Sequence, residues 1–149
     1  MALMAKFTIL PLSETDYEVI VDLWKDAGLT YRPEGRDAPE AIRGQMATAH
    51  CRFFGARGRR GTLLGTAIAT HEGRKGWINR LAVRPTAQRE GIARALVAAC
   101  EDWLFRQGIL IVAVLVEGDN RGSQSLFSAC GYERDDTLVY FRKLKKPGV

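Results

Sequence analysis

Two hydrophobic periodicities divide the chain into predicted helices and strands. Apolar residues recur every three to four positions in two stretches, one that starts at Ser13 and one that ends at Gly108. Pro39 suits the first turn of a shorter helix, and Asp119 or Asn120 suits the N-cap of another. We therefore expect helices over residues 13–28, 39–49, 92–108 and 120–131.

Six shorter runs have the composition of β-strands. Two turn-rich segments, 57–61 and 72–76, separate three of these runs, so the three are expected to pair antiparallel. The run 109–116 is apolar at every position, which is typical of a strand covered on both faces. The expected strands are residues 6–12, 51–56, 62–71, 77–83, 109–116 and 137–144.

The order of these elements predicts an α/β fold, a mixed sheet with helices on both faces. A chain of 149 residues has the usual size of one domain, so residues 1–149 are expected to form a single domain. Residues 77–116 form a strand, a crossover helix and a strand. Ligands of such units bind at the carboxyl ends of the strands.

Composition narrows the class of protein. With 46% apolar and 26% charged residues, the chain has the composition of a globular protein. Its longest aliphatic run, 109–116, is far shorter than the roughly 20 residues that cross a bilayer, so we expect a cytoplasmic protein without membrane contact. Cys51, Cys100 and Cys130 lack the spacing of a metal site or a disulfide frame, so all three are expected to be reduced and no metal is expected.

The net charge of +5 is unevenly distributed. Residues 52–94 hold ten Arg or Lys and two Glu, whereas residues 1–51 carry a net charge of −3. The basic block is expected to attract a polyanion: nucleic acid, an anionic membrane or a phosphorylated small molecule. Charge alone does not choose among these three.

The stretch with the clearest chemistry lies where the strand 77–83 leads into the long helix. A glycine-bearing turn, residues 88–93, opens that helix. Gly91 and the small Ala93 let a phosphate approach the main chain, where unpaired N–H groups and the positive end of the helix dipole favour an anion. The turn is thus a candidate pyrophosphate cradle, and an ordinary helix start with a glycine is the alternative. It is neither a P-loop nor a dinucleotide fingerprint.

At these positions the sequence resembles the GCN5-related N-acetyltransferases (GNAT), whose acetyl-CoA signature is Gln/Arg-x-x-Gly-x-Gly/Ala. Gln88, Gly91 and Ala93 fill that signature, and residues 120–132 are similar to the family's last helix. The resemblance extends over most of the chain, from residue 6 to 131. It implies a mostly antiparallel, twisted sheet with a splayed pair of strands, four and five, and acetyl-CoA as the acetyl donor.

The resemblance also implies residue roles. The pantetheine arm of acetyl-CoA is expected to pair with main-chain groups near Leu81 to Val83. Main-chain N–H groups of Arg89 to Arg94 are expected to hold the pyrophosphate, and an N–H near Leu81 to polarise the thioester carbonyl. An amine then attacks directly, without a covalent enzyme intermediate. The expected cofactor-binding residues are Leu81, Ala82, Val83, Gln88, Arg89, Glu90, Gly91, Ile92, Ala93, Arg94, Asn120 and Phe127.

Two positions depart from the family pattern. Phe127 stands where many members carry the tyrosine that protonates the departing thiolate. Leu115 stands where some members carry a glutamate base, and the nearest carboxylate is Glu117, two residues on and on the same strand face. Glu117 is therefore the candidate catalytic base. Leu81, through its main-chain N–H, is the other expected catalytic residue. The alternative is a loop carboxylate that caps the following helix or pairs with an arginine.

Two functions from different classes follow. The first is an N-acetyltransferase acting on a primary amine of a small molecule or a peptide N-terminus, with Tyr31, Arg32 and Asp37 lining the acceptor pocket. The second is a catalytically weak module of the same fold that binds acyl-CoA or docks on RNA, for which Phe127 is the main support. The intact cradle favours the enzyme and makes nucleic acid the less favoured partner. The oligomeric state is left open, with a homodimer among the alternatives.

Overall fold

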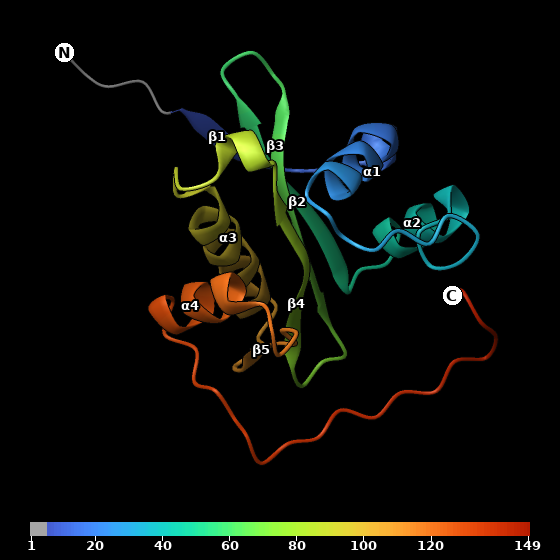
Figure 1. The fold of residues 1–149 in the computed structure, drawn as a ribbon, viewed down its shortest axis with the longest axis vertical. Helices are drawn as coiled ribbons and strands as arrows, with labels where there is room; N and C mark the ends of the chain where they lie inside the picture. Colours follow the sequence, from blue (N-terminus) through green and yellow to red (C-terminus); the bar gives the residue numbers. More distant parts are fainter. Residues whose placement is uncertain (1–5) are drawn as a thin grey trace.

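A computed structural model describes residues 6–149, which fold around one five-stranded sheet (Figure 1). The strands are ordered β1 (Phe7–Pro11), β2 (Cys51–Gly58), β3 (Leu63–His71), β4 (Gly76–Val83) and β5 (Val112–Val114). Neighbours from β1 to β4 pair antiparallel, and β4 pairs parallel with β5. The expected mixed and mostly antiparallel sheet is confirmed.

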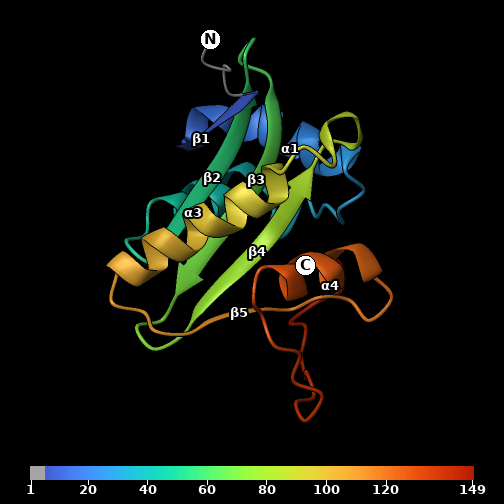
Figure 2. The ribbon, with the colours of Figure 1, turned by 90° about the vertical axis from the view of Figure 1, so that its left-hand side faces the viewer.

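Helices cover both faces of the sheet, as expected. α1 (Tyr17–Asp26) and α2 (Pro39–Met46) lie on one face, and α3 (Ile92–Arg106) and α4 (Arg121–Ala129) lie on the other (Figures 1 and 2). Short 3₁₀ turns, Glu14–Asp16 and Pro85–Ala87, precede α1 and α3. The capping box at the start of the first turn is present, because the Ser13 N–H donates to the Asp16 carboxylate at 2.9 Å.

Each face of the sheet has its own apolar core. On the α1 side, Ile20, Leu23 and Trp24 are fully buried, which accounts for their helical spacing in the sequence. On the α3 side, Leu96 and Leu104 are fully buried among the residues of that helix that face β3 and β4. Burying each of these side chains contributes about 1.5–3 kcal/mol to the stability of the fold. Because Leu96 and Leu104 lie toward opposite ends of α3, their burial holds both ends of the helix on the sheet.

The splayed pair of strands is present. β4 and β5 pair only from Gly76 to Ile78 and from Val112 to Val114. Beyond this point, no main-chain hydrogen bond joins residues 79–83 to residues 115–119. The seam between the strands is therefore open at the end of the sheet where α3 begins.

Two predicted strands differ in the structure. The run 109–116 forms only the three-residue β5, and it is not covered on both faces, because Leu110 is 91% exposed and Leu115 is 60% exposed. The strand predicted over residues 137–144 is absent, since that segment runs extended and unpaired away from the sheet (Figure 1). Both runs have strand composition, but a strand also needs a neighbour to pair with, and one chain does not supply it here.

Candidate active site

The start of α3 has the features of an anion site. Gly91 is the N-cap residue with φ +84°, and Arg89 also has a positive φ of 65°. A Cβ atom at Gly91 would meet no other atom within 4 Å, so the space in front of the turn is open. No main-chain N–H of residues 88–94 donates a hydrogen bond to another described residue. Seven consecutive amides are therefore free to bind an anion at the positive end of the helix dipole.

A β-bulge shapes β4 just before this turn. Between the pairs Thr66–Ala82 and Ile68–Asn79, two residues of β4, Arg80 and Leu81, oppose one residue of β3. Arg80 adopts φ +53°, which is rare for a residue with a side chain. The bulge falls where the seam to β5 opens, so the free edge of β4 at Leu81 faces the opening.

The bulge is held from the α1 side by a buried chain of hydrogen bonds. The Trp24 indole N–H donates to the Thr66 hydroxyl at 3.0 Å, and that hydroxyl donates to the Arg80 carbonyl at 3.4 Å. Thr66 and Trp24 are both buried. The core of α1 thus holds the main chain of β4 at Arg80, next to Leu81.

The loop that carries Tyr31, Arg32 and Asp37 is tied down by its own polar groups. The carboxylate of Asp37 is buried and accepts the Arg32 N–H at 2.8 Å. The Tyr17 hydroxyl donates to the Asp37 carbonyl at 2.7 Å and lies 3.2 Å from the Tyr31 hydroxyl. Burial, with the neighbouring Tyr31 hydroxyl, raises the pKa of Tyr17. Of the three predicted acceptor-site residues, only Arg32 has an exposed side chain without a partner among the described residues.

Arg80 connects this loop to the bulge, and sequence reasoning missed it. Its guanidinium stacks over the Trp24 ring at 4.1 Å from the centroid, donates to the Thr30 carbonyl at 2.8 Å and lies 3.4 Å from the Asp37 carboxylate. Burial lowers the pKa of Arg80, and the Asp37 charge opposes that change. In the sequence Arg80 is one positive charge among ten in residues 52–94, with no signal for the bulge.

Glu117 lies in the turn that follows β5. Its carbonyl accepts the Asn120 N–H at 2.9 Å, and its side chain is exposed. The Asn120 side chain caps α4 by accepting the Ser123 N–H at 3.0 Å, so Asn120 and not Glu117 is the cap of this helix. Within residues 6–149 the Glu117 carboxylate has no ion-pair partner.

Phe127 lies inside the packing between α3 and α4. It is 7% exposed, and its ring meets Tyr132 edge-on at 5.1 Å between centroids. The Tyr132 hydroxyl donates to the Glu101 carboxylate at 2.8 Å, and burial together with that hydrogen bond raises the pKa of Tyr132. Neither aromatic residue therefore offers a free acidic proton.

Thiol and metal chemistry find little support in the described part of the chain. Burial raises the pKa of Cys51 to about 11 and that of Cys100 to about 12, so both thiols stay protonated at neutral pH.

No group of three or more His, Cys, Asp or Glu side chains in residues 6–149 is arranged to hold a metal ion. No helix in this range is long and apolar enough to span a bilayer.

The acidic and basic parts of the chain meet in the fold. Arginines from the basic block form ion pairs with carboxylates from the first third of the chain: Arg57–Asp16, Arg80–Asp37, Arg84–Asp22 and Arg84–Asp26. Arg89 and Arg94, beside the cradle, have exposed side chains and no ion pair within the described residues. Part of the unpaired positive charge of the basic block therefore lies beside the free main-chain N–H groups at the start of α3.

The fold and site define a class: an α/β protein whose split sheet opens beside a helix start with free main-chain N–H groups. Residues 17–132 match the sequence model of the Acetyltransferase (GNAT) family, so the chain belongs to that family. The protein is an acetyltransferase by this membership, which confirms the resemblance drawn from the signature residues.

Relatives of similar length carry the same activity in their names. The chain is 25% identical over 131 residues to an acetyltransferase of Yersinia pestis (strain Pestoides F), covering 88% of this chain and 91% of the relative. It is 27% identical over 128 residues to acetyltransferase SG1711 of Sodalis glossinidius, covering 86% and 88%.

Solved structures share the fold. The aminoglycoside acetyltransferase AAC(6')-Iy, solved with a bisubstrate analogue, superposes with a TM-score of 0.78 at 23% identity, covering 94% of this chain and 99% of that one. The PaiA N-acetyltransferase of Thermoplasma acidophilum, solved with coenzyme A, gives a TM-score of 0.78 at 20% identity, covering 91% and 94%.

Proposed function

We propose that the protein transfers the acetyl group of acetyl-CoA to a primary amine of a small molecule or a peptide N-terminus. The observation that carries this is the row of free main-chain N–H groups at residues 88–94. This row includes Arg89 and Arg94, whose exposed side chains form no ion pair within the described residues. Such a row suits a pyrophosphate, and acetyl-CoA carries one. Neighbours in fold that were solved with coenzyme A or a CoA-linked analogue support the same ligand.

Different main-chain groups bind different parts of acetyl-CoA along the open seam between β4 and β5. The free edge of β4 from Leu81 to Val83 pairs with the pantetheine arm, and residues 88–94 hold the pyrophosphate. Acetyl-CoA supplies an electrophilic thioester carbonyl. The Leu81 N–H hydrogen-bonds the oxygen on which negative charge develops, which is the largest single contribution in this kind of catalysis. The amine attacks directly, as the family resemblance implies; Cys51 and Cys100, as buried protonated thiols, are unsuited as nucleophiles.

The acceptor is an amine of low pKa. An α-amine with a pKa of roughly 7.7–8.0 is about one third neutral at pH 7.5, whereas a lysine amine with a pKa of roughly 10.4 is about 0.1% neutral, a handicap on the order of 3–4 kcal/mol. Glu117 is the one carboxylate proposed to accept the proton. With Phe127 at this position and the nearby Tyr132 hydroxyl bonded to Glu101, the aromatic acid that many family members use to protonate the departing thiolate is missing here.

Acetyl-CoA binding tests the cradle. The parent protein should bind acetyl-CoA with a dissociation constant in the micromolar range, measured by calorimetry. This corresponds to a binding free energy of about 8 kcal/mol. Gly91→Glu places a negative charge where the pyrophosphate binds and should weaken binding by about tenfold to a hundredfold, roughly 1.4–2.8 kcal/mol. Gly91→Gln matches its size without the charge and should lose much less.

A second control separates the cradle from backbone strain. Gly61, in the turn between β2 and β3, has φ +83° and equally open space around it, so Gly61→Glu carries the same strain outside residues 88–94. It should bind acetyl-CoA like the parent. Unchanged binding by Gly91→Glu would show that the cradle assignment is wrong.

Turnover separates the enzyme from the binding module. A panel of amino sugars, peptides with free or blocked N-termini and free lysine derivatives is incubated with acetyl-CoA, and released CoA thiol is measured. We expect thiol release with α-amines and low-pKa amines. Acetyl-CoA binding without transfer to any amine would favour the catalytically weak module, for which the absence of an aromatic acid at Phe127 is the supporting observation.

A further inference from the structure

A groove separate from the acetyl-CoA seam lies beside α3. Its volume is about 430 Å³, and its walls come from β1 and β2 on one side and from residues 99–106 of α3 on the other. This volume is in the range of small-molecule binding sites. Gly91 in the cradle and Trp103 in the groove are roughly 18 Å apart along the helix axis, so the two sites are distinct.

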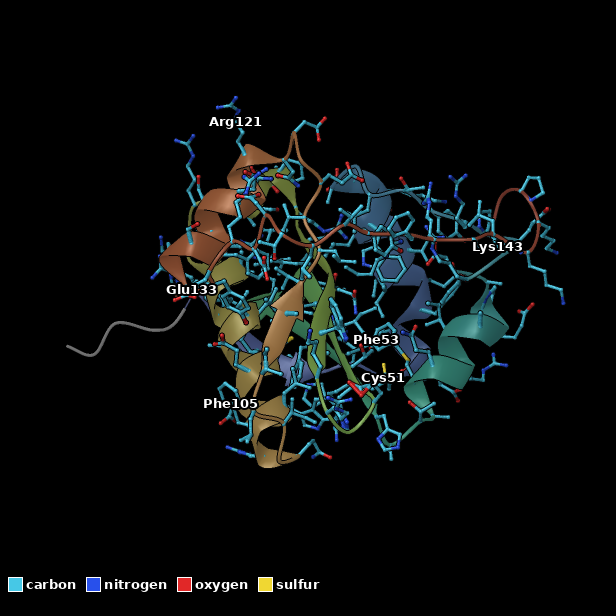
Figure 3. The ribbon with its side chains drawn as sticks, turned by 90° about the horizontal axis from the view of Figure 1, so that it is seen from below. Cys51, Phe53, Phe105, Arg121, Glu133 and Lys143 are labelled. Carbon is cyan, nitrogen blue, oxygen red and sulfur yellow. The ribbon has the colours of Figure 1, made fainter. Side chains whose placement is uncertain are left out.

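The alternation of residues in β2 explains which side chains reach the groove. Cys51 and Phe53 belong to the core on the α1 side, and Phe105 of α3 lies on the other side of the sheet (Figure 3). Successive residues of a strand face opposite sides, so Arg52 and Phe54 face α3. Both line the groove.

The apolar walls of the groove are recessed. Ile9, Phe54 and Trp103 are each half-buried, and none of them is among the exposed large hydrophobic side chains. The ring of His71 packs on that of Trp103, with 5.6 Å between the centroids. A recessed wall of this kind fits a small apolar body, whereas an ordinary protein–protein interface needs about 800 Å² of surface on each partner.

The outer edge of β1, next to the groove, is a poor template for an added strand. The Leu12 N–H donates to the Phe53 carbonyl at 2.8 Å, so the odd-numbered residues of β1 point their main-chain groups away from β2. Pro11 is one of these outward residues, and it has no N–H to donate. A small molecule therefore suits this groove better than an extended peptide.

The polar groups of the groove carry a net positive charge. The Arg52 guanidinium lies over the Trp103 ring at 5.9 Å from the centroid and forms no ion pair within residues 6–149. Arg106 is paired with Asp102 at 2.9 Å, so the charge of Arg52 is the one left over.

The Trp103 indole adds a second donor. Its N–H has no hydrogen-bond partner in the described part of the chain and is not fully buried. A guanidinium and an indole N–H can only donate, so the group that they bind is an acceptor, and the charge favours an anion.

We propose that this groove binds a small carboxylic acid with an apolar body. Arg52 and the Trp103 N–H hold the carboxylate, and the apolar body packs on Phe54 and Ile9. A carboxylate matches the planar fork of an arginine with two parallel hydrogen bonds, and the recessed walls add the free energy of burying apolar surface. The inference does not depend on acetyl transfer or on the identity of the acceptor.

NMR titration tests the site with 3-phenylpropionate. Its amide has the same shape without the charge, and acetate has the charge without the apolar body. The indole N–H resonances of the three tryptophans report binding, and Trp103→Phe assigns the one that belongs to the groove. We expect 3-phenylpropionate to shift the Trp103 resonance with a low-millimolar dissociation constant. The Trp24 resonance should stay in place, because that N–H is buried and bonded to Thr66.

The amide and acetate should each bind at least tenfold more weakly than 3-phenylpropionate. An unshifted Trp103 resonance, or equal binding of the acid and its amide, would overturn the proposal. Shifts at the amides of residues 88–94 in place of Trp103 would put the carboxylate in the cradle and would also overturn it. Acetyl-CoA is absent from this titration, so its outcome is independent of the proposed function.

Charge variants test Arg52. Arg52→Gln changes an exposed side chain, so the fold should be retained, and 3-phenylpropionate should bind at least tenfold more weakly while the amide binds as before. Arg60→Gln removes the same charge from an exposed arginine in the turn between β2 and β3, and it should bind like the parent. Equal weakening by both variants would show that overall charge attracts the acid, and would overturn the proposal.

A filling variant tests the groove itself. Ala99 lines the groove, and its neighbour Ala98 is exposed and does not line it. Ala99→Leu should weaken 3-phenylpropionate by tenfold or more, and Ala98→Leu should bind like the parent. The amide spectrum shows that each variant is folded. Unchanged affinity in a folded Ala99→Leu would show that the acid binds elsewhere.

Discussion

The link between Arg80 and Asp37 is expected to be one of the stronger polar contributions to stability outside the apolar cores. Arg80→Met keeps the apolar length that packs on Trp24 and removes the guanidinium. The Asp37 carboxylate, whose side chain is 5% exposed, then retains only the Arg32 N–H as a partner. An uncompensated buried charge is among the few defects that cost several kcal/mol.

The magnitude follows from burial. Removing one partner of a fully buried ion pair costs about 3–5 kcal/mol, and Arg80→Met should cost somewhat less, about 2–4 kcal/mol, because one fifth of the Arg80 side chain reaches solvent. Asp37→Asn keeps an acceptor for the Arg32 N–H and should cost about 1–2 kcal/mol. In the double variant no charge is left unpaired, so the coupling energy should be about 1–2 kcal/mol.

Urea unfolding followed by fluorescence measures these free energies, with midpoints and m-values fitted for the parent, both single variants and the double variant. Additivity of the two single changes to within about 0.5 kcal/mol would refute the reasoning, since it would show that the two groups do not interact.

Two further predictions concern proton transfer. Glu117→Gln should lower turnover by about 10²- to 10⁴-fold, most strongly at low pH and for amines of high pKa, while acetyl-CoA affinity stays the same; equal turnover across the pH profile would exclude Glu117 as the base. Phe127→Tyr should leave acetyl-CoA affinity unchanged and raise turnover if protonation of the thiolate limits the rate. Because the Phe127 ring is 7% exposed, the added hydroxyl would be buried without a hydrogen-bond partner unless it reaches the seam between β4 and β5. A buried hydroxyl of this kind should lower the free energy of unfolding by about 1–3 kcal/mol, so thermal unfolding is measured beside turnover.

The parts of the site that were predictable from the sequence are local. Gly91 stands directly after a strand and before a helix pattern, and φ +84° is a conformation that glycine adopts without strain. The amides that follow it are unpaired because any helix start leaves its first N–H groups without partners. The cradle therefore depends on a few consecutive residues, and a short motif is enough to place it.

The parts that were not predictable depend on partners distant in sequence. The bulge at Arg80 exists because Thr66 and Trp24 hold the main chain there, and neither contact leaves a pattern around residue 80. The run 109–116 and the segment 137–144 both have strand composition, yet the length of a strand is set by the edge beside it. Composition identified both as strand-forming, and the structure shows that a single chain leaves much of each unpaired.

The distribution of charge shows the same limit and bears on function. In the sequence, ten Arg or Lys residues between 52 and 94 predict attraction to any polyanion. In the fold, Arg57, Arg80 and Arg84 are paired with carboxylates from the first third of the chain, which reduces the field that an extended polyanion would meet. Arg89 and Arg94 keep their charge beside the free amides of α3. A compact site of this kind suits the few phosphates of acetyl-CoA better than the backbone of RNA.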